Sequence, residues 1–224
     1  MISRVFVRNK WTAAVAILLA GAVLYAADAP QTQNASPLGN KDVTKSETAL
    51  GSLVADATRK LLHTDLAFIA ASELKSKDPP IPSGKIATED IQPFVSYPDD
   101  SLDVLELTGK AIRQALEKSV SIYPQPNLGF LQVSGVQFTF DPKKPAGERV
   151  TSIKIGSAAL SESQTYTVAV TNSIAHGALG YWKVWEQDSI SRRATANIVG
   201  AVDAYLKASR KIDYATLDRI SVTK

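Results

Sequence analysis

The chain has 224 residues, and its apolar content of 45% fits one globular domain with a sizeable core. Of its 25 basic residues, three (Arg4, Arg8 and Lys10) precede the first acidic residue, Asp28, so the rest of the chain carries 22 basic and 22 acidic residues. This formal neutrality argues against nucleic-acid binding. The absence of cysteine excludes disulfides, thiolate metal sites and a cysteine nucleophile.

The N-terminus has the charge pattern of an export signal. Its basic residues precede an apolar run, Trp11–Ala27, which is just too short to span a membrane comfortably. A cleavage motif of small residues at 27–29 is followed by Pro30, which disfavours cleavage there. We therefore predict residues 1–27 to be a signal peptide or an N-terminal anchor, with cleavage favoured. The mature protein is predicted to be periplasmic, or otherwise outside the cytoplasm.

A linker and a domain are predicted to follow. Residues 28–43 are rich in Gln, Asn, Pro and Ser without an apolar period, which predicts a flexible linker. Residues 44–224 are predicted to form one domain without a further boundary. Its first helix is predicted from Glu47, because apolar residues then recur at steps of three and four. A short buried strand is predicted at 65–70, and Thr88 is predicted to cap a second helix.

The remainder of the chain is predicted to mix strands and helices. A strand at 102–107 leads into a helix that opens at Thr108, and a last helix is predicted at 194–206. The other strands are predicted at 136–140, 150–155, 166–170 and 220–222, the first two forming a hairpin. This order predicts an α+β fold, a single mixed α/β domain.

Residues that could carry catalysis are few. The chain has only two histidines, His63 and His176, too few for a two-metal phosphoesterase site. No nucleophile elbow, phosphate loop or dinucleotide fingerprint occurs. His63 is predicted to favour a helix C-terminus, and the pair Asp99-Asp100 to lie in a solvated turn. We therefore predict no catalytic residue, no metal ligand and no cofactor in this chain.

Five motifs in one order and spacing, between Thr44 and Tyr181, resemble the C-terminal domain of 5'-nucleotidases. The motifs lie at Glu47–Ala57, Leu105–Glu117, Gly129–Gly135, Phe138–Ile153 and Tyr166–Val170. The resemblance implies the α+β fold of that substrate-binding domain. Complete enzymes of the family begin with a two-metal phosphoesterase domain, of which this sequence has nothing. A divalent metal is thus expected only where a partner phosphoesterase supplies its site.

The resemblance also implies where a nucleoside would bind. The family uses an Asn-Ser-Gly-Gly-Ile-Arg loop, two aromatic rings that clamp the base, and a Gly-Gly-Asp-Gly-Tyr loop. Here the first loop, 70–75, reads Ala-Ala-Ser-Glu-Leu-Lys, so that Lys75 replaces the arginine. A lysine cannot make the bidentate hydrogen bonds of an arginine. Phe130 matches the first ring, Ile174 lies nearest the second, and Leu179 replaces the aspartate.

The predicted ligand-binding residues are Phe130, Lys75, Asn172 and Tyr181. Two competing interpretations stay open: Phe130 as a core aromatic residue, and Lys75 as a solvated loop lysine. Because polar anchors have been lost while the scaffold motifs remain, a nucleoside or nucleotide is expected to bind weakly or not at all.

The function predicted from these features is that of an exported, non-catalytic nucleotide-binding or partner module. It would act alone or in trans with a separately encoded metallophosphoesterase. One alternative is a component of a nucleotide hydrolase that supplies base recognition; another is a structural scaffold with a degenerate site. Whether the protein takes part in an enzyme is left open.

Overall fold

The structure is a computed structural model that describes residues 31–223. The signal or anchor predicted at 1–27 lies outside these residues. In the part of the chain that is described, no helix is both long enough and apolar enough to cross a membrane.

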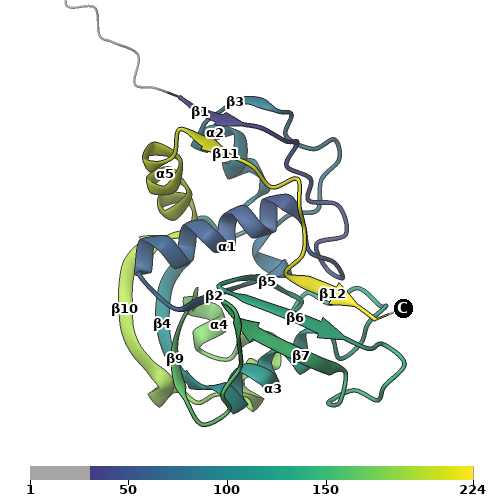
Figure 1. The fold of residues 1–224 in the computed structure, drawn as a ribbon. Coiled ribbons are helices and arrows are strands. Elements are labelled where there is room, and N and C mark those ends of the chain that lie inside the picture. Colours follow the sequence, from purple (N-terminus) through teal and green to yellow (C-terminus); the bar gives the residue numbers. More distant parts are fainter. Residues whose placement is uncertain (1–30, 224) are drawn as a thin grey trace, which may run out of the picture.

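A five-stranded mixed sheet forms the centre of the molecule (Figure 1). Its strands, in spatial order, are β10 (Ile190–Asn197), β4 (Ser101–Thr108), β9 (Thr165–Thr171), β2 (Leu66–Ala70) and β5 (Leu131–Ser134). The neighbours β2 and β9 run parallel, and the other pairs are antiparallel. Every residue of β2 and β5 is buried, which requires cover on both faces of the sheet there.

Helices provide that cover. The helices are α1 (Ala49–Leu62), α2 (Thr88–Ile91), α3 (Gly109–Ser119), α4 (Asn172–Ala175) and α5 (Ile198–Ala208). Helix α1 packs against β2, β5 and β9 and is covered in turn by α5, whereas α3 and α4 contact β4. This arrangement confirms the predicted α+β class.

Two smaller sheets flank the central one. The first contains the predicted hairpin and has the order β12 (Ile220–Val222), β6 (Val136–Phe140), β7 (Val150–Ile155) and β8 (Ala158–Ala159). The second has the order β11 (Lys211–Ile212), β1 (Thr32–Asn34) and β3 (Gly84–Ile86). Short 3₁₀ helices complete the fold: η1 (Ala71–Glu73), η2 (Gln92–Phe94), η3 (Ala178–Lys183) and η4 (Gln187–Ser189).

Helix α1 forms as its sequence pattern predicts. The Thr48 hydroxyl accepts a hydrogen bond from the Gly51 amide at 3.0 Å and so satisfies a free donor of the first turn. The helix ends at His63, whose backbone adopts the left-handed conformation with φ 53°. Gly51 is required by packing, because a Cβ there would clash with the side chain of the buried Gln132.

The predicted linker is wrong for its described part, residues 31–43. Strand β1 pairs with β3 and β11, and Leu38 forms an isolated bridge with Ile81. Leu38, Asn40 and Val43 are buried. A three-residue strand followed by single buried side chains has no periodicity, so the sequence pattern could not distinguish this segment from a linker. The domain boundary predicted at residue 44 therefore lies too late.

Two other predictions need correction. The helix predicted at 194–206 starts only at Ile198, where the Asn197 side chain accepts from the Gly200 amide at 2.8 Å. The preceding residues form β10, because pairing with β4 prevails over their weak local preference. Thr88 is the first residue of α2 rather than its cap, and its hydroxyl donates to Asp203 at 3.1 Å.

A partly buried ionic cluster links the C-terminal segment to α1. The Arg219 guanidinium donates two hydrogen bonds of 2.9 Å to the Asp56 carboxylate, which also accepts from the Tyr214 hydroxyl and from Ser134. The backbone amide of Arg219 donates to Glu47 at 2.9 Å. Each charge in the cluster therefore has an opposite charge or a hydrogen bond facing it.

Candidate ligand-binding site

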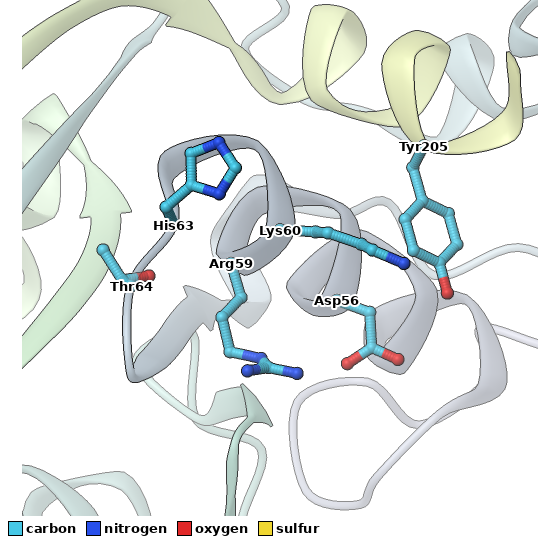
Figure 2. Close-up of a pocket in the computed structure, with 6 residues that line it drawn as sticks. All are labelled: Asp56, Arg59, Lys60, His63, Thr64 and Tyr205. Atoms are coloured by element: carbon cyan, nitrogen blue, oxygen red, sulfur yellow. The ribbon is translucent and has the colours of Figure 1, made fainter. Parts of the chain in front are cut away.

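Pockets lie at both ends of strand β2. Near its start, polar side chains of α1 and Tyr205 of α5 line one pocket (Figure 2). The other pocket lies beyond the end of β2 and has a volume of about 400 Å³. It is lined by η1 and by the segments that follow η2, precede β5 and follow β9. We call this second one the acidic pocket. Its lining residues are Ser72, Glu73, Tyr97, Asp100, Leu128, Ser173, Ile174, Ala178 and Leu179.

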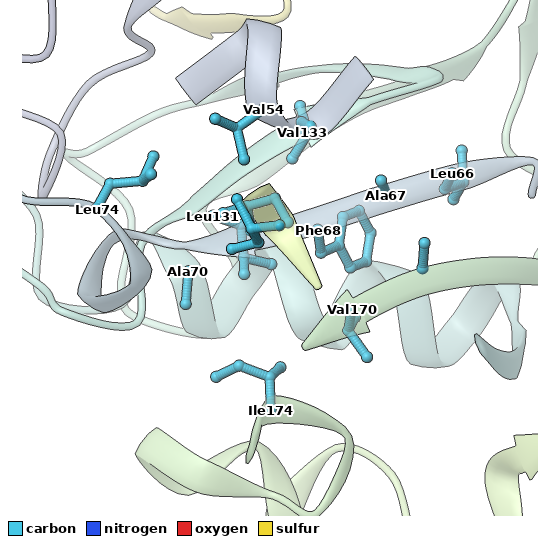
Figure 3. Packing of buried hydrophobic residues seen from close by; sticks show 14 of the residues in the cluster. Val54, Leu66, Ala67, Phe68, Ala70, Leu74, Leu131, Val133, Val170 and Ile174 are labelled. Carbon is cyan, nitrogen blue, oxygen red and sulfur yellow. The ribbon is translucent and has the colours of Figure 1, made fainter. Parts of the chain in front are cut away.

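The walls of the acidic pocket are mainly apolar. Leu128 and Tyr97 are more than half exposed, with exposed fractions of 59% and 57%, and Leu179 is 38% exposed. Ile174 is buried and points from α4 toward the sheet (Figure 3). Exposed apolar side chains around a hollow are typical of a surface that a ligand or a partner covers.

Glu73 is the unusual polar group of this pocket. Its side chain is 1% exposed, and Oε1 accepts hydrogen bonds from the hydroxyls of Thr171 at 3.3 Å and Ser72 at 3.5 Å. Among the described residues, Oε2 has no partner. Burial, and secondly the charge of Asp100, raise the pKa of Glu73 to about 7. The carboxyl can therefore donate a proton to a hydrogen bond in mild acid and accept one in mild base.

A second buried carboxylate, Asp103 of β4, lies behind the pocket. Its Oδ2 accepts from the Asn172 side chain at 2.9 Å, and its Oδ1 has no partner within residues 31–223. Nearby, the Ser173 amide donates to Asp100 at 3.3 Å. The predicted ligand residue Asn172 thus has its amide engaged by Asp103 and does not line the pocket.

The two predicted aromatic residues belong to the core. Phe130 is 1% exposed, and its carbonyl accepts from the Ala71 amide at 2.8 Å. Tyr181 is fully buried, its hydroxyl donates to the Gly129 carbonyl at 2.7 Å, and its ring stacks on Trp185 with centroids 4.9 Å apart. Burial raises the pKa of the Tyr181 hydroxyl well above its ordinary value. A buried ring offers no free face for stacking, which favours the interpretation of Phe130 as a core aromatic residue.

Lys75 also lies outside the acidic pocket. Its side chain is exposed, and its backbone is fixed by hydrogen bonds to the Phe94 carbonyl at 2.7 Å and from the Asn40 side chain at 2.8 Å. None of the four predicted ligand residues therefore lines the pocket. The structure instead brings Ile174 and Leu179 to it, two of the positions at which the sequence departs from the family pattern.

Several pocket residues were not predicted as ligand-binding residues, among them Glu73, Tyr97, Asp100 and Leu128. Glu73 carried a signal, because it is a charged residue directly before Leu74 in a segment that continues a buried strand. Asp100, predicted to be a solvated turn residue, contributes instead to the charge at the pocket.

Both histidines lie at helix C-termini. His63 ends α1, and His176 ends α4 with Nδ1 2.8 Å from the Asn172 carbonyl oxygen. The described residues contain no group of three or more His, Cys, Asp or Glu side chains that could hold a metal ion.

This fold is an α+β domain with a pocket beyond the ends of two parallel strands, β2 and β9. The family model of the 5'-nucleotidase C-terminal domain matches residues 23–187. The chain therefore belongs to the 5'-nucleotidase C-terminal domain family, as its motifs predicted.

Individual relatives agree with this assignment. The chain is 32% identical to a trifunctional nucleotide phosphoesterase of Bacillus subtilis (strain 168). The matched segment covers 62% of this chain and 10% of the phosphoesterase. The chain is 29% identical to an apyrase of Aedes albopictus, over 80% and 33% of the respective chains. A 5'-nucleotidase precursor from Thermus thermophilus superposes with a TM-score of 0.76 at 26% identity, over 86% of this chain and 39% of that chain. The chain thus spans a third or less of these two curated relatives.

Proposed function

We propose that this domain is a non-catalytic binding module whose acidic pocket takes an uncharged, nucleoside-like molecule. The observation that carries the proposal is the buried Glu73, whose Oε2 lacks a partner among the described residues, at a pocket with apolar walls. A buried carboxylate oxygen without a hydrogen bond is unfavourable, and a donor on a ligand would relieve this. The names of the relatives, which refer to nucleotides, favour a nucleoside as that ligand.

The charge of the pocket favours a nucleoside over a nucleotide. Its lining contains Glu73 and Asp100 but, among the described residues, no lysine or arginine. A phosphate group at this pocket would face two carboxylates without a cation to compensate. An adenine-like ring can instead lie between Leu128 and Leu179 and donate an amino hydrogen bond to Glu73.

Titration with adenosine tests where the ligand binds. At pH 8, Glu73→Gln should weaken adenosine binding about tenfold, because the amide accepts less strongly than the carboxylate. Leu128→Ser removes one apolar wall and should weaken it by a similar factor. The matched control is Lys75→Gln, outside the pocket, which should leave the affinity unchanged. Binding that only Lys75→Gln weakens, or no binding at millimolar adenosine, would contradict the proposal.

Hydrolysis, on this proposal, requires another protein. The scarcity of histidine, with only His63 and His176 in the chain, supports a module that relies on a separately encoded metallophosphoesterase. The purified domain with Mn²⁺, Zn²⁺ or Mg²⁺ should release no phosphate from AMP. Phosphate release that persists through repurification, and that His63→Asn or His176→Asn abolishes, would show a catalytic centre in this chain.

A second candidate function is protein binding at the same rim. Tyr97, Leu128 and Leu179 are exposed around the pocket, and Trp182 of η3 is 65% exposed. Such a surface also fits a phosphoesterase partner. Co-purification from an envelope extract, compared between wild type and Trp182→Ser, tests this. Protein binding is supported if a phosphoesterase co-purifies with the wild type but not with Trp182→Ser. If no phosphoesterase co-purifies with the wild type, ligand binding alone is favoured.

Export remains part of the proposal. The basic-then-apolar N-terminus, residues 1–27, supports a location outside the cytoplasm. A C-terminal reporter fusion should therefore fractionate with the periplasm or the outer face of the inner membrane, and mass spectrometry of the N-terminus distinguishes cleavage from anchoring.

A further inference from the structure

The pocket near the start of β2 lies at the opposite end of this strand from the acidic pocket. It is about 310 Å³ in volume and lies between the last turn of α1 and α5 (Figure 2). Its lining residues are Asp56, Arg59, Lys60, His63, Thr64 and Tyr205. Because β2 has five residues, at about 3.3 Å each, the two pockets are roughly 15 Å apart or more. A ligand here is therefore independent of the proposed function.

Positive charge dominates this pocket. Its one carboxylate, Asp56, is paired with Arg219. Within the described residues, no carboxylate lies within 4.0 Å of Arg59, Lys60 or His63. The Arg59 Nε donates to the Ser134 hydroxyl at 2.8 Å, which fixes the side chain, while no residue in 31–223 accepts a hydrogen bond from its terminal nitrogens. A held guanidinium with free donors is suited to an anionic oxygen.

An apolar pocket of about 200 Å³ adjoins the charged one and shares Lys60, His63 and Tyr205 with it. The other lining residues of this half are Ala57, Leu61, Ala201, Ala204 and Ala208. The ammonium of Lys60 lies 5.5 Å from the centroid of the Tyr205 ring, at the junction of the two halves. We call the combined pocket the basic groove. It has a cationic end and an apolar end.

Stabilisation of the helix terminus accounts for part of this charge. Arg59 and Lys60 lie in the last turn of α1, where cations interact favourably with the helix dipole. It does not account for His63 at a left-handed position, φ 53°, where glycine is the usual residue. Nor does it account for the adjoining apolar half. We propose that the basic groove binds an organic anion that carries a short, unbranched apolar chain.

Calorimetric titration with hexyl phosphate tests this proposal on the whole mature protein. Hexyl phosphate should bind about tenfold or more tightly than either inorganic phosphate or hexanol, because each of these fills only one half of the groove. Lys60→Gln should weaken hexyl phosphate binding about tenfold and make it less sensitive to salt. Ala204→Leu should weaken it by filling the apolar end.

Two further variants control for side effects. Lys207→Gln, on α5 but outside the groove, removes the same charge and should leave the affinity unchanged. His63→Asn suits the left-handed backbone and removes the imidazole, so it should weaken binding without unfolding α1. The proposal is overturned if hexyl phosphate does not bind at about 5 mM. It is equally overturned if Lys60→Gln and Ala204→Leu both leave its binding intact.

Vesicles distinguish the two sources of such an anion. The protein could co-sediment with phosphatidylglycerol vesicles but not with vesicles of pure phosphatidylcholine. If hexyl phosphate then prevents this co-sedimentation, the ligand of the groove is a lipid headgroup. Hexyl phosphate binding without any co-sedimentation would assign it to a free organic anion.

Discussion

Two polar clusters of this domain, one partly and one fully buried, differ in how many hydrogen bonds and opposite charges their carboxylates have. Around Asp56, both carboxylate oxygens accept hydrogen bonds, and Arg219 supplies the opposite charge. Around Glu73, one oxygen has weak partners and the other none among the described residues, and Asp103 nearby has a second unpaired oxygen. The first cluster fastens chain segments together, whereas the second leaves hydrogen-bonding capacity unused at a pocket.

The two clusters are therefore expected to have different roles, the first in stability and the second in ligand binding. A satisfied ion cluster becomes unfavourable when one partner is removed, because the remaining charge is left buried. An unsatisfied carboxyl is already unfavourable in its charged form and gains from a ligand or a proton. Substitutions in the Asp56 cluster should therefore affect folding, and substitutions at the acidic pocket should affect binding and pH dependence.

The largest expected effect follows from removing Arg219. Arg219→Met leaves Asp56 and Glu47 without their cation and should lower the free energy of unfolding by about 3 to 5 kcal/mol. Urea denaturation measures this. Arg210→Met, an exposed residue of the same segment, is the matched control and should change stability by less than about 0.5 kcal/mol. Similar values for both variants would show that the cluster does not fasten the C-terminus.

A comparable loss is expected from the core ring that the sequence assigned to ligand binding. Phe130→Ala should lower the free energy of unfolding by about 3 to 5 kcal/mol, because it leaves a cavity in the core. Leu179→Asn is the contrasting variant: the residue is 38% exposed with φ 55°, a conformation that asparagine tolerates. Its stability should stay within about 0.5 kcal/mol of wild type. A Phe130→Ala protein of wild-type stability would show that the ring is free for a ligand after all.

An intermediate effect is expected in the pH dependence of stability. Between the ordinary pKa of Glu73, 4.5, and its raised pKa of about 7, the folded state holds a proton that the unfolded state has released. Stability should therefore fall as pH rises across this range, by about 2 to 3 kcal/mol from this group alone.

Glu73→Gln should remove this part of the pH dependence, whereas Glu106→Gln, an exposed residue of β4, should retain it. Thermal or urea unfolding at several pH values measures the slopes. Parallel profiles for wild type and Glu73→Gln would mean that the buried carboxyl does not titrate in this range.

The sequence predicted most of the fold but not the identity of the pocket residues. Helix α1 and the β6–β7 hairpin have strong periodicity and were predicted correctly. Strand β1 is three residues long, and β10 lacks alternation, so each depends on a partner strand distant in sequence. Such pairing cannot be inferred from local pattern alone.

The loops and the side chains that the sequence assigned to a ligand fall differently with respect to the acidic pocket. The loop 70–75 and the last loop, 177–181, both contribute residues to the acidic pocket. Motif position does not determine whether a ring such as Phe130 faces the pocket or the core, because this depends on packing from several segments. The role of Glu73 likewise depends on burial, which its position in the motif did not reveal.

The most direct test of the acidic pocket compares adenosine with AMP at pH 8, where the raised pKa leaves Glu73 mostly ionised. The two ligands differ only in the phosphate, which two carboxylates should repel. Adenosine should bind at least about tenfold more tightly than AMP, and Glu73→Gln should narrow that ratio. If AMP binds as tightly as adenosine or more tightly, the pocket is not one for an uncharged ligand.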